Sequence, residues 1–225
     1  MRIDHVQFPV PDVSAGAAFF RDVLGLPVDG GLVQVGRSRL RLVPAADAVH
    51  ATQHLAFSVP GDAGRAAHDW LAQRVELLGH DGQDGQDLFE APPSWDACSS
   101  YFPGADGTVL ELIARRRRPE RLGGDDFGPG HLLAISEVGI PVASVAEARR
   151  RLARAAGAAP FGGPGSETFS AVGDDDGLLV LVAPGRAWFP TRDHLARPAG
   201  LVVDLSGTRG RGELVLDPGT LMRYA

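Results

Sequence analysis

Two histidines and one glutamate combine the residue types and the strand positions that a metal site requires. His5, His54 and Glu111 each lie beside alternating apolar residues in stretches that predict β-strands. Because alternate residues of a strand point to opposite faces, all three side chains are expected on the face turned away from the apolar packing. Two imidazoles and one carboxylate leave open positions on a divalent ion such as Zn, Fe, Mn, Ni or Co. Such an ion polarises a bound oxygen as a Lewis acid.

The same alternation places further polar side chains on this face. Arg41 could hold an anionic group through a bidentate guanidinium, although a surface arginine on a short edge strand is an equal alternative. Trp95 could stack on a planar ligand or anchor its own loop. Glu111 could also exchange a proton with a substrate, which makes it the candidate catalytic residue. The candidate substrate-binding residues are Arg41, Arg39, Gln7, Ser58, Trp95 and Tyr101.

The elements that position these residues recur along the chain. The first unit predicts strands at 3–10, 31–35 and 39–43 and a helix at 15–25, with Asp12 or Ser14 as N-cap and Gly25 as C-cap. The second unit repeats this order, and the predicted elements are strands at 55–59, 75–78, 99–102 and 108–114 and a helix at 63–74. A third unit follows residue 130, and GLVVDLSG resembles the opening of a fourth without a helix.

This repetition predicts an α+β fold of four βαβββ modules paired into two domains. The first domain spans 1–115 and contains modules 1–49 and 50–115. Residues 116–130 are rich in Arg, Gly and Pro and predict a linker, and the run Arg115–Arg118 at the domain boundary is interpreted as part of a solvated connector. A degenerate second domain spans 131–225. It has Glu137 at the position of His5, and one polar candidate of three predicts no metal there.

Three stretches resemble the vicinal oxygen chelate superfamily of glyoxalases, extradiol dioxygenases and fosfomycin or bleomycin resistance proteins. They are DHVQFPVPD with its helix ending in VLGLPV, HLAFSVPG, and YFPGADGTVLEL, although Pro103-Gly104-Ala105 departs from the family's usual turn. The resemblance implies one divalent metal on His5, His54 and Glu111, and His50 is the substitute ligand. It implies a metal-dependent lyase, isomerase, transferase or dioxygenase acting on a small, oxygen-bearing, anionic substrate. The alternative is a non-catalytic protein that binds a drug or metabolite.

Composition narrows the class of partner. A net charge of −6 over 225 residues argues against a nucleic-acid surface. The single cysteine, Cys98, fits a reducing compartment, and no stretch has membrane-spanning length. We therefore expect a cytoplasmic monomer or homodimer that binds a small molecule, with no membrane or nucleic-acid partner.

Overall fold

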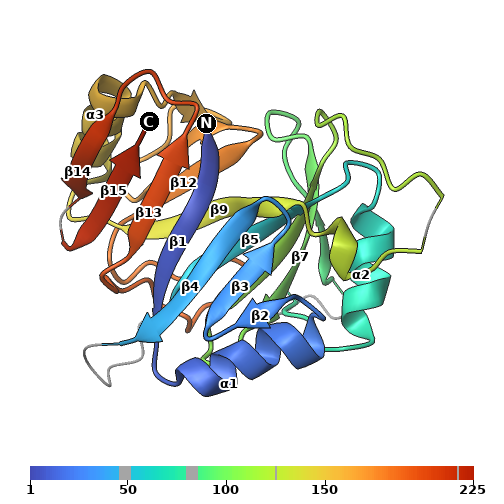
Figure 1. Cartoon of the computed structure of the whole chain (residues 1–225). Helices are drawn as coiled ribbons and strands as arrows, with labels where there is room; N and C mark the ends of the chain where they lie inside the picture. Colours follow the sequence, from blue (N-terminus) through green and yellow to red (C-terminus); the bar gives the residue numbers. More distant parts are fainter. Residues whose placement is uncertain (46–51, 80–85, 125, 217) are drawn as a thin grey trace.

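The alternating stretches of the sequence form two twisted β-sheets that lie one behind the other (Figure 1). The computed structural model describes residues 1–45, 52–79, 86–124, 126–216 and 218–225. The expected α+β class is confirmed, because a few helices accompany two sheets that are each built from two modules.

The sheet at the front of Figure 1, the β1 sheet, has the strand order β14-β15-β13-β1-β4-β3-β2. It contains the first module and the short fourth one. Its strands are β1 (Arg2–Val10), β2 (Val28–Asp29), β3 (Leu32–Val35), β4 (Ser38–Pro44), β13 (Val202–Ser206), β14 (Gly212–Leu216) and β15 (Thr220–Tyr224).

The other sheet, the β5 sheet, has the strand order β10-β11-β12-β9-β5-β8-β7-β6. It contains the second and third modules. Its strands are β5 (His54–Val59), β6 (Leu88–Glu90), β7 (Ala97–Pro103), β8 (Val109–Arg115), β9 (Ala134–Pro141), β10 (Pro160–Phe161), β11 (Phe169–Asp174) and β12 (Gly177–Val182). The predicted strand 75–78 is represented by an isolated bridge between Leu78 and Tyr101.

This strand order corrects the expected pairing of modules. The first strands of modules two and three pair as antiparallel neighbours, β5 with β9, while β1 pairs with β13 of the fourth module. The connection between modules two and three holds β9 beside β5. The Gly61 amide donates to the Glu120 carbonyl over 3.1 Å, and the Leu133 amide donates to the Ser58 carbonyl over 2.8 Å. Glu120 of the connection and Leu133 after it are therefore bonded to the second module, which a repeat pattern alone does not specify.

In the described part of the chain, three α-helices, a π-helical turn and a 3-10 turn pack around the layers. The first helical segment is α1 (Val13–Ala18), continued by η1 (Phe19–Val23), and its N-cap is Asp12, whose carboxylate accepts from two backbone amides. Gly25 follows with a φ of +67°, as expected of a helix terminator. The other helices are α2 (Gly64–Ala72), η2 (Pro129–His131), a 3-10 turn, and α3 (Val145–Ala156).

Apolar side chains from the inner faces of both sheets form one core. Val6 and Phe8 of β1 belong to the same buried cluster as Leu55 and Phe57 of β5. Because the inner faces share this core, the outward faces of β1 and β5 lie on opposite sides of the molecule. Any side chain on the outward face of β1 is therefore separated from the outward face of β5 by both sheets.

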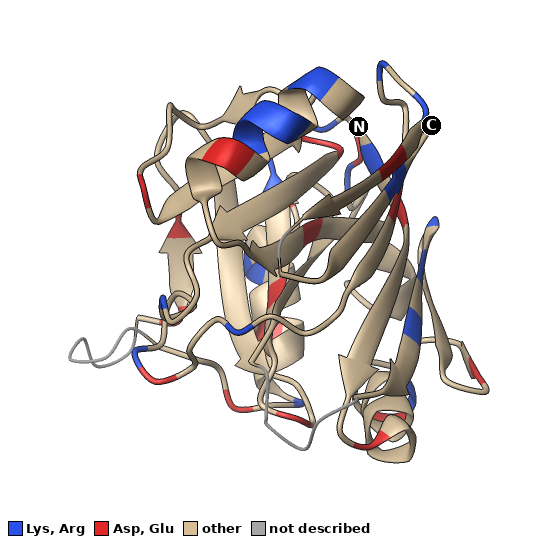
Figure 2. Cartoon of the chain, turned by 90° about the vertical axis from the view of Figure 1, so that its left-hand side faces the viewer, with Lys and Arg blue, Asp and Glu red and all other residues tan. Residues whose placement is uncertain are grey.

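Charged residues are distributed over the surface in both signs. Figure 2 shows basic residues along α3, which contains Arg149, Arg150, Arg151 and Arg154 and has Glu147 in its first turn. Among the described residues, no helix is both long and apolar enough to span a membrane.

Candidate functional site

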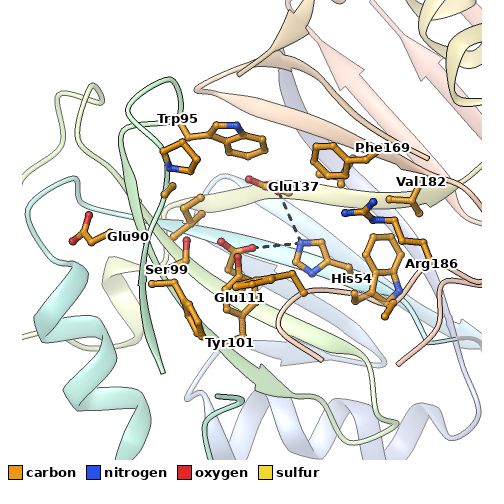
Figure 3. Close-up of a pocket in the computed structure, with 18 residues that line it drawn as sticks. His54, Glu90, Trp95, Ser99, Tyr101, Glu111, Glu137, Phe169, Val182 and Arg186 are labelled. Carbon is orange, nitrogen blue, oxygen red and sulfur yellow. Dashed lines mark ion pairs between the residues drawn. The ribbon is translucent and has the colours of Figure 1, made fainter. Parts of the chain in front are cut away.

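A pocket of about 270 Å³ lies on the outward face of the β5 sheet (Figure 3). Strands β5, β6, β7, β8, β9, β11 and β12 contribute residues to it, and the segment 186–189 that follows β12 closes one side. Its lining residues are His54, Phe89, Glu90, Ala91, Pro92, Trp95, Ser99, Tyr101, Glu111, Ile113, Glu137, Phe169, Val180, Val182, Arg186, Ala187, Trp188 and Phe189.

Three ionisable side chains meet on the floor of this pocket. His54 Nε2 lies 3.4 Å from Glu111 Oε2 and 3.9 Å from Glu137 Oε2. Strand register explains the meeting, because Ala56 of β5 is the cross-strand neighbour of both Glu111 on β8 and Glu137 on β9. His54 precedes Ala56 by two residues and so shares its face. The small Ala56 side chain leaves space between the two carboxylates.

The orientation of the His54 ring is fixed by contacts on two sides. Its Nδ1 lies 3.0 Å from the Val109 carbonyl, so Nδ1–H donates there and Nε2 faces the carboxylates. The Trp188 indole stacks on the ring with centroids 5.4 Å apart, and Trp188 Nε1 donates to the Thr52 carbonyl over 3.0 Å. Gly139 makes this packing possible, since a Cβ there would lie 2.5 Å from the indole.

A buried arginine holds the second carboxylate. Arg115 has no exposed surface, and its Nη2 donates to Glu137 Oε1 in a short ion pair. The hypothesis of a solvated Arg115–Arg118 connector is therefore wrong for two of its members. Arg118 is also buried, and it pairs with Asp176 and Glu120, whereas Arg116 and Arg117 are more exposed.

Proximity and burial shift the proton affinities of the cluster. Burial alone would lower the pKa of His54, but Glu111 and Glu137 raise it to about 9. Burial and the charge of Glu137 raise the pKa of Glu111. Burial opposes ionisation of Glu137 as well, but the Arg115 charge and His54 lower its pKa below the usual range. One carboxylate is thus held ionised while the other is the better proton acceptor.

The donor set fits a divalent transition metal. One imidazole nitrogen and two carboxylate oxygens lie within 4.8 Å of one another. Nitrogen and oxygen donors of this kind suit Zn, Fe, Mn, Ni and Co. Val109 and Arg115 bond the remote atoms of His54 and Glu137, as outer partners of metal ligands typically do.

His5, the third expected ligand, does not belong to this group. It lies on β1 in the other sheet, where its Nδ1 is 3.2 Å from Asp204 Oδ2 of β13. The alternation correctly placed His5 on an outward face, but that face belongs to the β1 sheet. Glu137, the residue at the position of His5 in the third module, stands with His54 and Glu111 instead.

Four of the expected substrate-binding residues lie away from the pocket, and two line it. Gln7, Arg39 and Arg41 are on β1 and β4, and Arg41 Nη1 donates to the Gly30 carbonyl over 2.9 Å. Ser58 is buried and donates to the Ala134 carbonyl. The residues that do line the pocket are Trp95, which also packs on Phe161, and Tyr101, the cross-strand neighbour of Glu111. His50, the substitute ligand, is outside the described residues.

Sequence reasoning missed several residues of the pocket. Glu137 carried a usable signal, because it shares the strand position of His5, but the assumed module pairing removed it from the set. Arg115 was missed because it begins a basic run that is typical of exposed connectors. Arg186 and Trp188 lie beyond the last recognisable strand of the third module, where no repeat guides the interpretation.

Comparison with known proteins identifies the family of the chain. A model of the Glyoxalase/Bleomycin resistance protein/Dioxygenase superfamily matches residues 2–182. No curated protein matches the sequence. A solved structure titled "putative dioxygenase" from Bacillus subtilis is 14% identical with a TM-score of 0.62, over 100% of this chain and 84% of the other. Glyoxalase I from Zea mays is 12% identical with a TM-score of 0.55, over 99% of this chain and 91% of the other. At these identities the two structures show a shared fold.

Proposed function

Because the chain belongs to the Glyoxalase/Bleomycin resistance protein/Dioxygenase superfamily, we propose that its pocket is the active site of a divalent-metal-dependent enzyme. His54, Glu111 and Glu137 would hold the ion. The proposal rests on one observation, the convergence of these three side chains from three adjacent strands within 4.8 Å. The substrate would be a small oxygen-bearing molecule, and the reaction a lyase, isomerase, transferase or dioxygenase reaction.

When bound, the metal would supply Lewis-acid activation of a substrate oxygen. The residues of the chain itself orient the substrate, exclude water and carry a proton. Trp188 and the neighbouring aromatic side chains exclude water from the floor of the pocket, which strengthens electrostatic interactions there. Glu111 is our candidate acid–base group when it is released from the ion, because burial and the charge of Glu137 raise its pKa in the metal-free cluster. Arg115 keeps Glu137 ionised and in place.

A non-catalytic binding protein is the second candidate, and the charge balance of the cluster favours it. A protonated His54 and Arg115 together balance Glu111 and Glu137, so the floor of the pocket is neutral without a metal. An aromatic pocket over a neutral floor suits reversible binding of a drug or metabolite.

Metal binding by matched variants separates the two candidates. After treatment with a chelator, the wild-type protein is titrated with Zn, Mn, Ni, Co and, without oxygen, Fe(II) by calorimetry. We expect one ion per chain for the wild type and for His5→Gln. Glu137→Gln should lose at least about 100-fold in affinity, the upper end of what removal of an outer partner costs.

The absence of tight binding to the wild type would favour the binding protein, and a loss confined to His5→Gln would contradict the site. A positive result leads to activity assays of the metal-loaded and stripped protein. Glutathione adducts, catechols and epoxides are the first substrates to screen.

A further inference from the structure

Aromatic rings form most of the pocket wall above the three ionisable residues. Phe89, Tyr101 and Phe189 pack edge to face, with centroids 5.0 to 5.6 Å apart. Phe189 is 49% exposed and is one of two large apolar side chains that are exposed among the described residues. The other rings of the wall belong to Trp95, Phe169 and Trp188. Such walls bury flat, apolar molecules and favour stacking with another ring.

One arginine brings a positive charge to this wall. Arg186 is exposed to solvent and follows β12, and Figure 3 shows it beside Phe169 and Val182. Its guanidinium carbon lies 5.1 Å from the centre of the Phe169 ring, and its Nη1 donates to Thr168 Oγ1 over 3.2 Å. These contacts hold the guanidinium beside the Phe169 ring, and its other N–H groups have no acceptor among the described residues and can donate to a ligand.

Arg186 differs from the other arginines near the pocket in having no acidic partner among the described residues. Arg115 is paired with Glu137, and Arg116 is paired with Glu90 at 2.7 Å. Glu90 also borders the pocket, but Arg116 compensates its charge, and Figure 3 shows it on the side away from Arg186. The lining therefore combines one compensated carboxylate at the rim with one uncompensated guanidinium.

We propose that Arg186 binds the carboxylate of a flat aromatic acid. The ring of this acid lies against the aromatic wall, and the oxygen substituents at its other end reach His54, Glu111 and Glu137. A planar guanidinium with free N–H groups matches a carboxylate bidentately. The charge also lies on the side where an anion avoids Glu90. This inference names the substrate class of the proposed active site and rests on the proposed function for the oxygen end of the ligand. It assigns to Arg186 the anion-binding role that the sequence suggested for Arg41.

Two probes of equal shape isolate the role of the charge. Calorimetry on the metal-loaded protein compares 3,4-dihydroxybenzoate with its uncharged amide, 3,4-dihydroxybenzamide. We expect the acid to bind about 10- to 100-fold more tightly, the range of a hydrogen-bonded charge pair. Arg186→Gln should remove this preference and leave the affinity of the amide unchanged. Arg197→Gln is the matched control, because Arg197 is exposed in the same segment but does not line the pocket.

Equal binding of acid and amide to the wild type would overturn the inference, and so would binding of neither. An equal loss of both affinities in Arg186→Gln would also overturn it. Lactate, an aliphatic hydroxy acid, should bind at least about tenfold more weakly than the aromatic acid, and similar affinities would refute the aromatic half of the proposal. Glu137→Gln separates failure of this inference from failure of the metal site. If Arg186 alone causes the preference for the acid over the amide, that preference should persist in Glu137→Gln.

Discussion

The outward faces of the two sheets have the same strand plan and different side chains. In the β5 sheet, His54 and Glu111 lie on a first strand and a closing strand that run parallel. In the β1 sheet, His5 lies on the corresponding first strand, and Arg41 takes the register position that matches Glu111. A guanidinium cannot ligate a cation, so the β1 face has lost one ligand position outright.

The two faces also differ in how far they exclude water. The side chains of His54, Glu111 and Glu137 are each at most 7% exposed, whereas those of His5 and Asp204 are 23% and 34% exposed. Burial makes the ionisable groups of the β5 face dependent on one another, while solvent screens the pair on the β1 face. Equivalent strands thus provide positions for a site, and the residues that cover them decide whether its charges interact strongly.

The largest predicted difference between the faces is in stability. Arg115→Met leaves the buried Glu137 carboxylate without its main partner, and we expect the free energy of unfolding to fall by about 3–5 kcal/mol. Asp204→Asn removes the partner of His5 on the β1 face and should cost at most about 1 kcal/mol. Urea denaturation of both metal-free variants at pH 7 measures the contrast, and similar losses would abolish the distinction between the faces.

The next effect is a dependence of metal affinity on pH. His54 must be neutral to bind a metal, and its pKa of about 9 keeps it protonated at neutral pH in the metal-free protein. Affinity should therefore rise about tenfold per pH unit between about pH 6 and pH 8, because each ion displaces one proton. Competition with a chromophoric chelator measures this slope, which His5→Gln should share. A flat profile would show that His54 is already neutral or is not a ligand.

Sequence alternation predicted the direction of each side chain well and the partner of each strand poorly. Two of the three expected ligands, His54 and Glu111, belong to the same module, and period-two alternation places both on the outward face of its sheet. The repeat could not say whether β5 would meet β1 or β9, since either edge offers the same backbone groups. In the folded chain β5 pairs with β9, and this pairing decides between His5 and Glu137 as the third member.

The residues of the pocket wall were harder to predict from sequence patterns than the expected metal ligands. Trp95 was expected from its place in a polar, glycine-rich loop and Tyr101 from its adjacency to the predicted site, and both line the pocket. Trp188 and Arg186 follow the last strand of the third module in a segment without regular alternation. Only the folded chain brings that segment over His54, through the stacking of Trp188 on the imidazole.

A smaller effect is predicted where that segment meets the β5 face. In Gly139→Ala, the new methyl group would lie 2.5 Å from the Trp188 ring and 3.0 Å from the Cβ of His54, so the indole must move. We expect a loss of about 1–3 kcal/mol and a red shift of tryptophan emission, because Trp188 is 4% exposed in the native packing. Gly130→Ala is the control, since no atom of the described residues lies within 4 Å of its added carbon. If both variants showed the same stability and the same tryptophan emission, Trp188 would not be packed tightly over His54.

The smallest effect is expected for Arg41→Ala on the β1 face. Arg41 donates to the Gly30 carbonyl on the side of the molecule opposite the pocket, so its removal should change stability by no more than about 0.5 kcal/mol. The affinity for 3,4-dihydroxybenzoate should stay within about twofold of the wild type, because two sheets and the core separate Arg41 from the ligand. Calorimetry of Arg41→Ala beside Arg186→Gln tests this directly. A tenfold loss in Arg41→Ala would mean that the β1 face takes part in binding the anion, and the functional separation of the two faces would then be wrong.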